Sequence, residues 1–474
     1  MVLRRVVYIK IRKLTENTVI LGILSLIWLI SRSGTKPSRI VYPCQKAAAA
    51  ISYTTLFYPI LAFSAVFSRK LVSKSVRMIK FSNRKSRLFS VLLLSVSILF
   101  SSFAIFISFL ITNPREALRE RTAPLERVAS VSVVHIEGSE VEEALERALG
   151  YLGGVEKIVP EGSRVMIKPN IVQNQAPPDT SDPSIVKAVI DIVKKQNPST
   201  IWIADGSGHD NTTENFRSLG FSSVAEQTGA KLVDLNYGEM VNVDVPGGGV
   251  VFDNFTFNRI VIEADVLISV TCMKTHSQAV VTLGMKNLIR LAPGSIYGFP
   301  KAILHDKAQE KGDNYMAGVI VDLCKTRKID LLIIDGRIGM EGEGPHQGTP
   351  VQLDLIIVGT DPVATDSVAS TIMGFDPEKV PSTKLGQQEG LGTNNLQEIE
   401  VKGEKLEDVF HMFKPATGHD SFQIFSSSYL SLYQAGPSLA YISVICWALT
   451  FVFLFFTKRK LLLRSNSNFS ERIT

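Results

Sequence analysis

Residues 267–294 read LISVTCMKTHSQAVVTLGMKNLIRLAPG and combine an apolar run with a dense group of polar side chains. The apolar run predicts a buried strand, and Lys274 and His276 follow it at its carboxyl end. In an open parallel sheet, ligands bind outside the carboxyl ends of the strands. We therefore expect this segment to supply one strand of an α/β sheet and, directly after it, part of a site.

Similar apolar runs recur from about residue 131 to residue 412. Most are unbroken and rich in β-branched residues, which is typical of strands buried on both faces of a parallel sheet. They are residues 131–136, 164–170, 200–205, 231–235, 265–270, 330–335 and 353–359. Amphipathic segments between them predict helices at residues 139–152, 182–196, 278–290 and 361–373. This alternation predicts an α/β domain with a layered, mostly parallel sheet, flanking helices and an inserted hairpin at residues 245–262.

Polar residues follow four of the predicted strands. An Asp-Gly pair after a strand is as often a simple turn, but four polar strand ends on one sheet favour a site. We expect the following residues to bind a small anionic substrate: Lys168, Asn170, Asp205 and Lys274. His209 and His276 are the candidates for proton transfer, because imidazole changes its protonation state near neutral pH.

Two further groups suggest a cofactor or a metal. Lys286 lies among small and apolar neighbours, and a partly buried amine can act as a nucleophile or anchor a cofactor. In the glycine-rich segment 341–348, Glu341 and Glu343 could hold a divalent ion, with a solvated, mobile loop as the alternative. His305 is a further candidate metal ligand. Asp361 and Asp366 are expected to start the helix 361–373 as its cap and first-turn residue.

The motifs of this domain resemble those of the DUF362 family, bacterial and archaeal proteins without an established common activity. They are KPNIV, DGSG, KTHSQAVVTLGMKNL with APG, IIDGRIGMEGEGPHQGTP and GTDPVATDSVASTIMGFDP. Some family members carry ferredoxin-like cysteine clusters. This chain has no such cluster, so the resemblance implies no electron-transfer role here.

A more distant resemblance is to the nickel-pincer lactate racemases. Their order of a Gly-x-His turn, a second histidine, a cofactor-holding lysine and a further histidine is similar to His209, His276, Lys286 and His305. The resemblance implies that Lys286 would hold the cofactor and His305 would bind the metal. The chain departs from the racemase pattern at Leu283-Gly284, where those enzymes have a glycine pair.

Both ends of the chain are rich in uncharged apolar residues, and 45% of all residues are hydrophobic. Because about 20 helical residues cross the hydrocarbon core, we expect spans at residues 17–31, 47–67, 88–112 and 438–456. The first segment is short and could instead be a signal-type anchor. Residues 1–112 would then form a membrane region, joined to the α/β domain by a linker at 113–130 and followed by a second linker at 413–437.

Charge predicts the orientation of these spans. Residues 68–87 and the tail 457–474 are basic, and basic segments beside membrane helices stay in the cytoplasm. Residues 131–412 would then lie outside the cytoplasm in a multi-pass protein of the cell membrane. The basic loop favours lipid headgroups, not nucleic acid, as its partner.

Four cysteines are spread along the chain without a CxxC pair, so no iron-sulfur cluster or zinc ribbon is expected. Cys272 and Cys324 would be able to form a disulfide only if the fold brings them together.

The sequence thus favours a membrane-anchored protein with an enzyme-like site for a small anionic substrate. A non-catalytic ligand-binding or envelope-associated module is the alternative. A second alternative is racemase-like or isomerase-like proton transfer with a metal cofactor.

Overall fold

The computed structural model describes residues 118, 119, 121, 128–136, 140–209 and 211–426. The chain divides into two compact units, and all the described residues belong to the unit Pro114–Ser426. The four expected membrane spans, at residues 17–31, 47–67, 88–112 and 438–456, lie outside the described residues. Within the described part, none of the helices has the length and apolar character needed to cross a bilayer.

A nine-stranded mixed sheet organises the described part of the chain, with the strand order β11-β1-β10-β9-β7-β2-β3-β4 and β8 paired to β7. β9, β7, β2, β3 and β4 are mutually parallel, whereas β10 runs antiparallel to both β9 and β1. The strands are β1 (Ala129–His135), β2 (Arg164–Lys168), β3 (Thr200–Asp205), β4 (Lys231–Asp234), β7 (Val266–His276), β8 (Val280–Thr282), β9 (Leu331–Glu343), β10 (Gln347–Gly359) and β11 (Ile399–Gly403).

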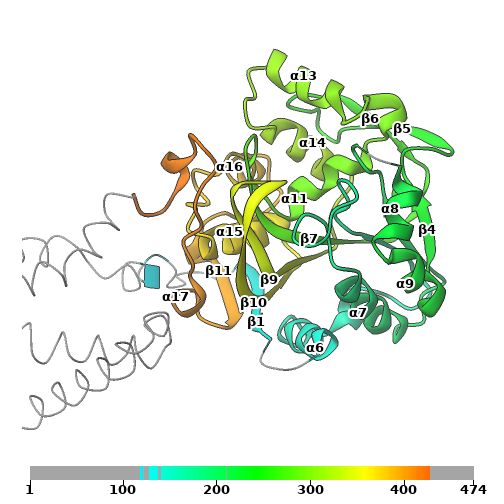
Figure 1. Ribbon diagram of the computed structural model, residues 1–474, viewed down its shortest axis with the longest axis horizontal. Coiled ribbons are helices and arrows are strands. Elements are labelled where there is room, and N and C mark those ends of the chain that lie inside the picture. Colours follow the sequence, from blue (N-terminus) through cyan, green and yellow to red (C-terminus); the bar gives the residue numbers. More distant parts are fainter. Residues whose placement is uncertain (1–117, 120, 122–127, 137–139, 210, 427–474) are drawn as a thin grey trace, which may run out of the picture. The chain divides into compact units, whose positions relative to one another are not determined.

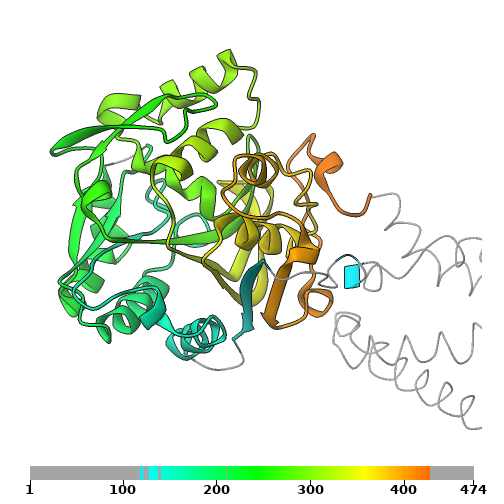
Figure 2. The same ribbon diagram turned by 180° about the vertical axis from the view of Figure 1, so that it is seen from behind.

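Helices cover both faces of this sheet (Figure 1; Figure 2). One face carries α6 (Val141–Tyr151), α7 (Pro183–Lys194), α8 (Thr212–Ser218) and α9 (Phe221–Thr228). The other carries α11 (Gly284–Asn287), α14 (Ala317–Thr326), α15 (Pro362–Ile372) and α16 (Pro381–Gln388). Successive side chains of a strand point to opposite faces, so Leu267 of β7 joins one core while Ile268 joins the other.

Smaller elements surround this three-layer body. They are the two-stranded sheet of β5 (Met240–Asp244) and β6 (Asn254–Asn258), α10 (Ile260–Glu263), α12 (Gly294–Tyr297), α13 (Ala302–Glu310) and α17 (Leu406–Val409). Residues 413–426, which the sequence suggested as part of a linker, pack onto the body. Phe413 is fully buried, and the Ile424 amide donates to the Gly374 carbonyl oxygen.

Two helices that flank the sheet begin in the same way. Asp182 and Asp361 are the N-cap residues of α7 and α15, and each side chain accepts a hydrogen bond from a first-turn amide. A proline occupies the first turn of each helix, where its missing N–H costs nothing. The predicted cap Asp361 is therefore confirmed.

The structure confirms the mostly parallel sheet and all seven predicted strands. The long helix predicted at residues 278–290 is wrong, because β7 continues through His276 into a hairpin with β8, and only short helical turns follow. The inserted hairpin is present but begins earlier, at Met240. Residues 341–348 form the end of a hairpin, because Glu341 and Glu343 belong to β9, which pairs with β10 as far as Glu343 and Gln347, and residues 344–346 make the turn.

Candidate functional site

The order of the parallel strands reverses between β2 and β7. From β2 the chain proceeds outward through β3 to β4 and then returns to β7 on the other side of β2. Such a reversal leaves a crevice at the carboxyl ends of the strands, where ligands bind in open α/β sheets. Lys168 and Asp205 end β2 and β3, and Lys274 and His276 lie near the end of β7. The fold therefore gathers the predicted strand-end residues at one place.

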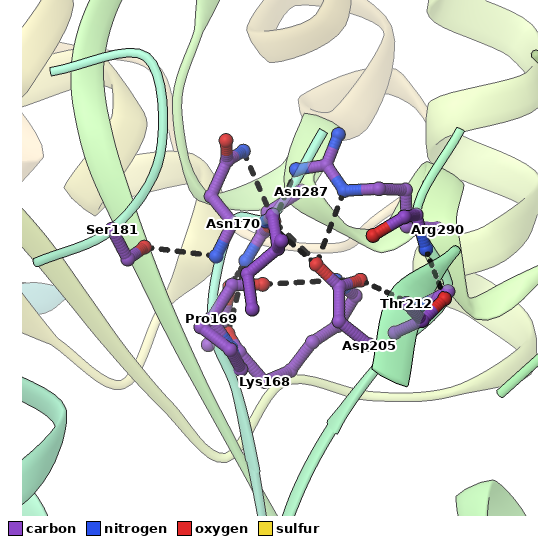
Figure 3. A network of polar contacts seen from close by, with 12 residues as sticks. Lys168, Pro169, Asn170, Ser181, Asp205, Thr212, Asn287 and Arg290 are labelled. Atoms are coloured by element: carbon purple, nitrogen blue, oxygen red, sulfur yellow. Dashed lines mark hydrogen bonds and ion pairs between the residues drawn. The ribbon is translucent and has the colours of Figure 1, made fainter. Parts of the chain in front are cut away.

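Asp205 is the centre of a buried polar network at this reversal (Figure 3). Its carboxylate lies 2.7 Å from Lys168 Nζ and 3.3 Å from Arg290 Nε, and it also accepts from the amides of Ile171 and Gly206. Burial lowers the pKa of Lys168 to about 8, against the charge of Asp205, which raises it. Through these hydrogen bonds and ion pairs, the Asp205 carboxylate joins the ends of β2 and β3 to the segment after β8.

Asn287 ties the same network to α11. Its side-chain nitrogen donates to the Lys168 carbonyl oxygen and to Ser269 Oγ, at 3.1 and 3.0 Å. Its side-chain oxygen accepts from Asn170 Nδ2 at 3.2 Å and from Arg290 Nη2 at 3.3 Å. Because both ends of its amide are used, Asn287 holds α11 in one orientation.

Gly206 permits this close approach. A Cβ atom at residue 206 would lie 3.0 Å from the Arg290 carbonyl oxygen and 2.9 Å from Asn236 Oδ1. A larger residue would push the chain after α11 away from β3. Close packing therefore requires glycine at residue 206.

Lys274 and His346 share a second carboxylate, Asp179. Lys274 Nζ donates to the Asp179 carbonyl oxygen at 2.5 Å and lies 3.7 Å from Oδ1, while His346 Nδ1 lies 2.8 Å from Oδ2. Burial opposes the charged form, but the hydrogen bond from His346 and the charge of Lys274 keep the pKa of Asp179 below its usual value. Asp179 therefore stays ionised between the Lys274 amine and the His346 ring.

Lys286 differs from the other cations of the site because it has no counterion. Within the described residues its amine makes no hydrogen bond and no ion pair. Desolvation by the surrounding protein, followed by the charges of Arg290 and Lys274, lowers the pKa of Lys286 to about 7. At neutral pH a large fraction of this amine is therefore uncharged.

Two histidines lie within the electrostatic reach of Lys286. Burial, then the charges of Lys286 and Lys274, lower the pKa of His276 well below its usual value. Burial and Lys286 also lower the pKa of His305, a partly buried residue of α13. His276 Nδ1 accepts from the amides of Gln278 and Ala279, at 3.0 and 3.2 Å. The neutral ring therefore carries its proton on Nε2.

His209 is exposed and lies beside His346, with their ring centroids 6.2 Å apart in an edge-on arrangement. The order His209, His276, Lys286 and His305 that resembles the racemase pattern thus occurs on segments around the same crevice. His209 follows β3, His276 ends β7 and Lys286 follows β8, whereas His305 lies further along the chain on α13.

The acidic pair lies on β9 and binds a neighbouring segment. Glu341 Oε2 accepts from the Lys414 amide at 2.8 Å, and Glu343 Oε1 accepts from the Thr417 amide at 3.0 Å. Across the described part of the chain, no group of three or more His, Cys, Asp or Glu side chains is arranged to hold a metal ion. Glu341 and Glu343 therefore act here as anchors for residues 414–417.

Sequence reasoning missed Asp179, His346 and Arg290 as site residues. Asp179 and His346 are 167 positions apart and meet only when the loop after β2 reaches the tip of the β9–β10 hairpin. The available signal was the histidine in the glycine-rich segment 341–348. Arg290 could have been found from its spacing of three residues after Asn287 on a helical turn.

Cys272 and Cys324 are both buried and free, so the disulfide left open by the sequence does not form. Two surface hollows, of about 450 and 320 Å³, lie on other elements. The first involves α16 and residues 394–397, and the second lies between residues 251–254 and α12 with α13. Neither includes a residue of the strand-end crevice.

The fold and the site define an α/β protein with a cluster of buried cationic side chains at the reversal of its sheet. The family described as "Domain of unknown function (DUF362)" matches residues 165–371. The thylakoid-associated protein sll1697 of Synechocystis sp. (strain ATCC 27184 / PCC 6803 / Kazusa) is 31% identical over 277 residues, which cover 56% of this chain and 81% of that relative. The chain belongs to the DUF362 family.

Among solved structures, the lactate racemase apoprotein from Thermoanaerobacterium thermosaccharolyticum is similar, with 14% identity and a TM-score of 0.33. The similarity covers 51% of this chain and 55% of that one. A TM-score at this level establishes neither a shared fold nor a shared activity.

Proposed function

We propose that this protein binds a small anion at the strand-end crevice and transfers protons to or from it, as an enzyme anchored to a membrane. The observation that carries the proposal is the partly buried Lys286 amine, which lacks a counterion in the described part of the chain and lies near two histidines.

The charge of the crevice supports an anionic ligand. Its cationic side chains are Lys168, Lys274, Lys286 and Arg290, whereas Asp179 and Asp205 are its only carboxylates among the residues described above. A carboxylate or phosphate group beside Lys286 would supply the missing negative charge. Lys168, Asn170, Asp205 and Lys274 are almost fully buried, so we assign them the support of the crevice and assign ligand contact to Lys286 and Arg290.

Proton transfer is supported by the imidazoles around the amine. His276 is held neutral with its proton on Nε2, so it can donate a hydrogen bond to a developing negative charge. An ionisable amine with a pKa of about 7 is suited to general acid-base chemistry near neutral pH. A module that only binds ligand needs neither feature.

Binding of a small anion should be accompanied by proton uptake, because a bound negative charge raises the pKa of Lys286 from about 7. Calorimetric titration of the full chain with lactate or inorganic phosphate, in two buffers of different ionisation enthalpy, measures the number of protons taken up. At pH 8 we expect that number to approach roughly one per anion.

Lys286→Met should abolish the uptake, whereas Lys384→Met, on the exposed side of α16, should leave it unchanged. Binding with no proton uptake in the unaltered protein would contradict the role of Lys286. Binding without any turnover of candidate substrates would favour the ligand-binding module.

Racemase-like chemistry is a second candidate, favoured by the position of Lys286 near His276 and His305. In that case Lys286 would hold an organic cofactor, and the cofactor would supply a metal for proton or hydride chemistry. His305, on α13, would be the candidate imidazole ligand of that metal. Peptide mass analysis of protein from its native host, together with metal analysis, tests it. An unmodified Lys286 peptide and no bound nickel would exclude it while leaving the anion site untouched.

A further inference from the structure

We infer that His346 is the general base of this site and that Asp179 is its positioning residue, with His276 as the opposing hydrogen-bond donor. This inference rests on the proposed function, because it assigns the acid and base roles within the same crevice. Neither Asp179 nor His346 belongs to the residues that the sequence suggested for catalysis.

The contacts of His346 fix the position of its proton. Its Nδ1 lies 2.9 and 2.8 Å from the two oxygens of Asp179 and 3.2 Å from Gln173 Nε2. The Gln173 amide has Asp179 Oδ2 as its acceptor, and an ionised carboxylate can only accept, so the shorter Asp179 contacts require a proton on Nδ1. The Nδ1 atom of the neutral ring therefore carries the proton and Nε2 keeps its lone pair. Within the described residues Nε2 has no hydrogen-bond partner, and the side chain is 28% exposed. The free lone pair is thus open to a proton from a ligand.

The contacts of His276 fix the opposite tautomer. Two backbone amides donate to its Nδ1, and backbone amides cannot accept in return. Its Nε2 must therefore carry the proton in the neutral ring. The amide of Ser277, the residue after His276, donates to the Gly344 carbonyl oxygen at 2.9 Å, so His276 and His346 lie on segments that touch. When two groups of one kind are held in opposite states, the environment has assigned one as base and the other as donor.

Side chains on several sides hold the Asp179 carboxylate in position. The Gln173 side-chain amide donates to its Oδ2 at 3.1 Å, and Lys274 lies on the other side of the carboxylate. The Asp179 side chain is only 4% exposed, so solvent does not compete for it. Among the described residues, the charged and titratable groups around His346 are Asp179, Lys274 beside that carboxylate, His209 edge-on, and His276 on the segment bonded to Gly344.

The step balances as a simple proton transfer. An X–H bond of the bound anion breaks, its electron pair stays on X, and the proton passes to His346 Nε2. The resulting imidazolium is stabilised by the Asp179 carboxylate, and the charge on X by His276 Nε2–H and Lys286. Reversal of the step returns the proton from His346 Nε2 to X. If the ligand presents another face to His346, the proton goes to a different atom of the ligand.

Alkylation of the full chain by bromoacetate tests the assignment without knowledge of the substrate. The Nε2 lone pair displaces bromide from carbon, so a C–Br bond is replaced by an N–C bond and the ring becomes an imidazolium. Bromoacetamide, which has a similar size and no charge, is the matched reagent. Peptide mass analysis locates the modified ring.

We expect His346 to be alkylated in preference to His276, and bromoacetate to react several-fold faster than bromoacetamide. In Asp179→Asn the amide oxygen can still accept from Nδ1, but the negative charge is lost. The pH midpoint of His346 alkylation should therefore move to lower pH. In His346→Gln the fast reaction should disappear.

The outcomes separate the two proposals. Modification of His276 instead of His346 would overturn the assignment of the base, and this comparison needs no variant. An unchanged midpoint in Asp179→Asn would overturn the role of Asp179. Equal rates with the charged and the neutral reagent, at His346 in both cases, would overturn the anion site while leaving the base assignment intact.

Discussion

Lys286 is the residue whose chemistry depends most on its surroundings. A free lysine has a pKa of 10.5, and desolvation here lowers it to about 7. A folded-state pKa below the unfolded value means that the folded protein binds the proton less tightly. The resulting penalty is fully present below pH 7 and vanishes above about pH 10.5, so the free energy of unfolding should rise with pH across this range.

Replacing Lys286 with methionine should therefore stabilise the protein, since it removes the unpaired amine and keeps an unbranched apolar side chain. We expect a gain of roughly 2 kcal/mol at pH 7, discounted for the partial exposure of the site, and no gain near pH 10.5. Denaturant unfolding of the full chain at several pH values measures it. A destabilised variant at pH 7 would show that the amine has a stabilising partner after all.

At the scale of single residues, the sequence predicts the candidates whose local setting is distinctive. His276 comes soon after an apolar run that predicts a strand, and Lys286 stands among apolar neighbours, so both can be proposed without coordinates. Asp179 could not be identified, because nothing in its loop distinguishes it from a turn aspartate. Its role depends on Lys274 and His346, which come from distant parts of the chain.

At the scale of elements, the contact between α15 and α11 holds the short helix that carries Lys286. The Asp366 carboxylate accepts from the amides of Gly284 and Met285, at 2.8 and 3.0 Å. Sequence reasoning placed Asp366 in the first turn of its own helix. It is instead a fully buried cap for the short helix that carries Lys286, and this role depends on the packing of α15 against α11.

Burial raises the pKa of Asp366 from 3.8 to about 7, although the two amides act in the opposite direction. A raised folded-state pKa means that the stabilising contribution is complete below about pH 4 and is lost as the pH rises to about 7. The unaltered protein should thus lose roughly 1–3 kcal/mol of stability relative to Asp366→Asn between these pH values.

Paired unfolding curves of the two proteins from pH 4 to pH 8 measure this difference. The opposite slope, with the unaltered protein gaining on the asparagine variant, would show that the two amides hold the carboxylate ionised. Ser370→Ala, one turn further along α15 and equally buried, is the control for packing in that helix.

The pairing of β8 with β7 explains why the helix expected at residues 278–290 was wrong. Its amphipathic pattern is real, but β8 pairs with the end of β7 and withdraws residues 280–282 from any helix. At Gly284 a Cβ atom would lie 2.1 Å from the Leu332 side chain, so this turn also requires close packing against β9. The periodicity of one segment cannot show that a neighbouring strand will form hydrogen bonds with its backbone amides.

At the scale of the whole molecule, membrane anchoring stays a prediction that rests on the apolar segments of the sequence. They lie outside the described residues, and within the described part no helix could cross a bilayer. The described unit therefore would have to be anchored by residues before Pro114 or after Ser426.

Orientation is the property on which the location of the site depends. The basic segment 68–87 and the basic tail 457–474 predict cytoplasmic positions, so the α/β domain should lie on the opposite side. Reporter fusions after Asn83 and after Arg464 should give cytoplasmic signals. For the domain, a single cysteine at Asn254→Cys is preferable to a fusion, since Asn254 is exposed on the β5–β6 hairpin.

The labelling experiment needs a chain in which only the new cysteine reacts. Cys272 and Cys324 are buried and can remain, whereas Cys44 and Cys446 are replaced by serine. In intact cells, a maleimide that cannot cross the membrane should label the residue 254 thiol if the domain lies outside. Labelling only after the cells are opened would place the domain in the cytoplasm, and the anion for the Lys286 crevice would then have to be an intracellular one.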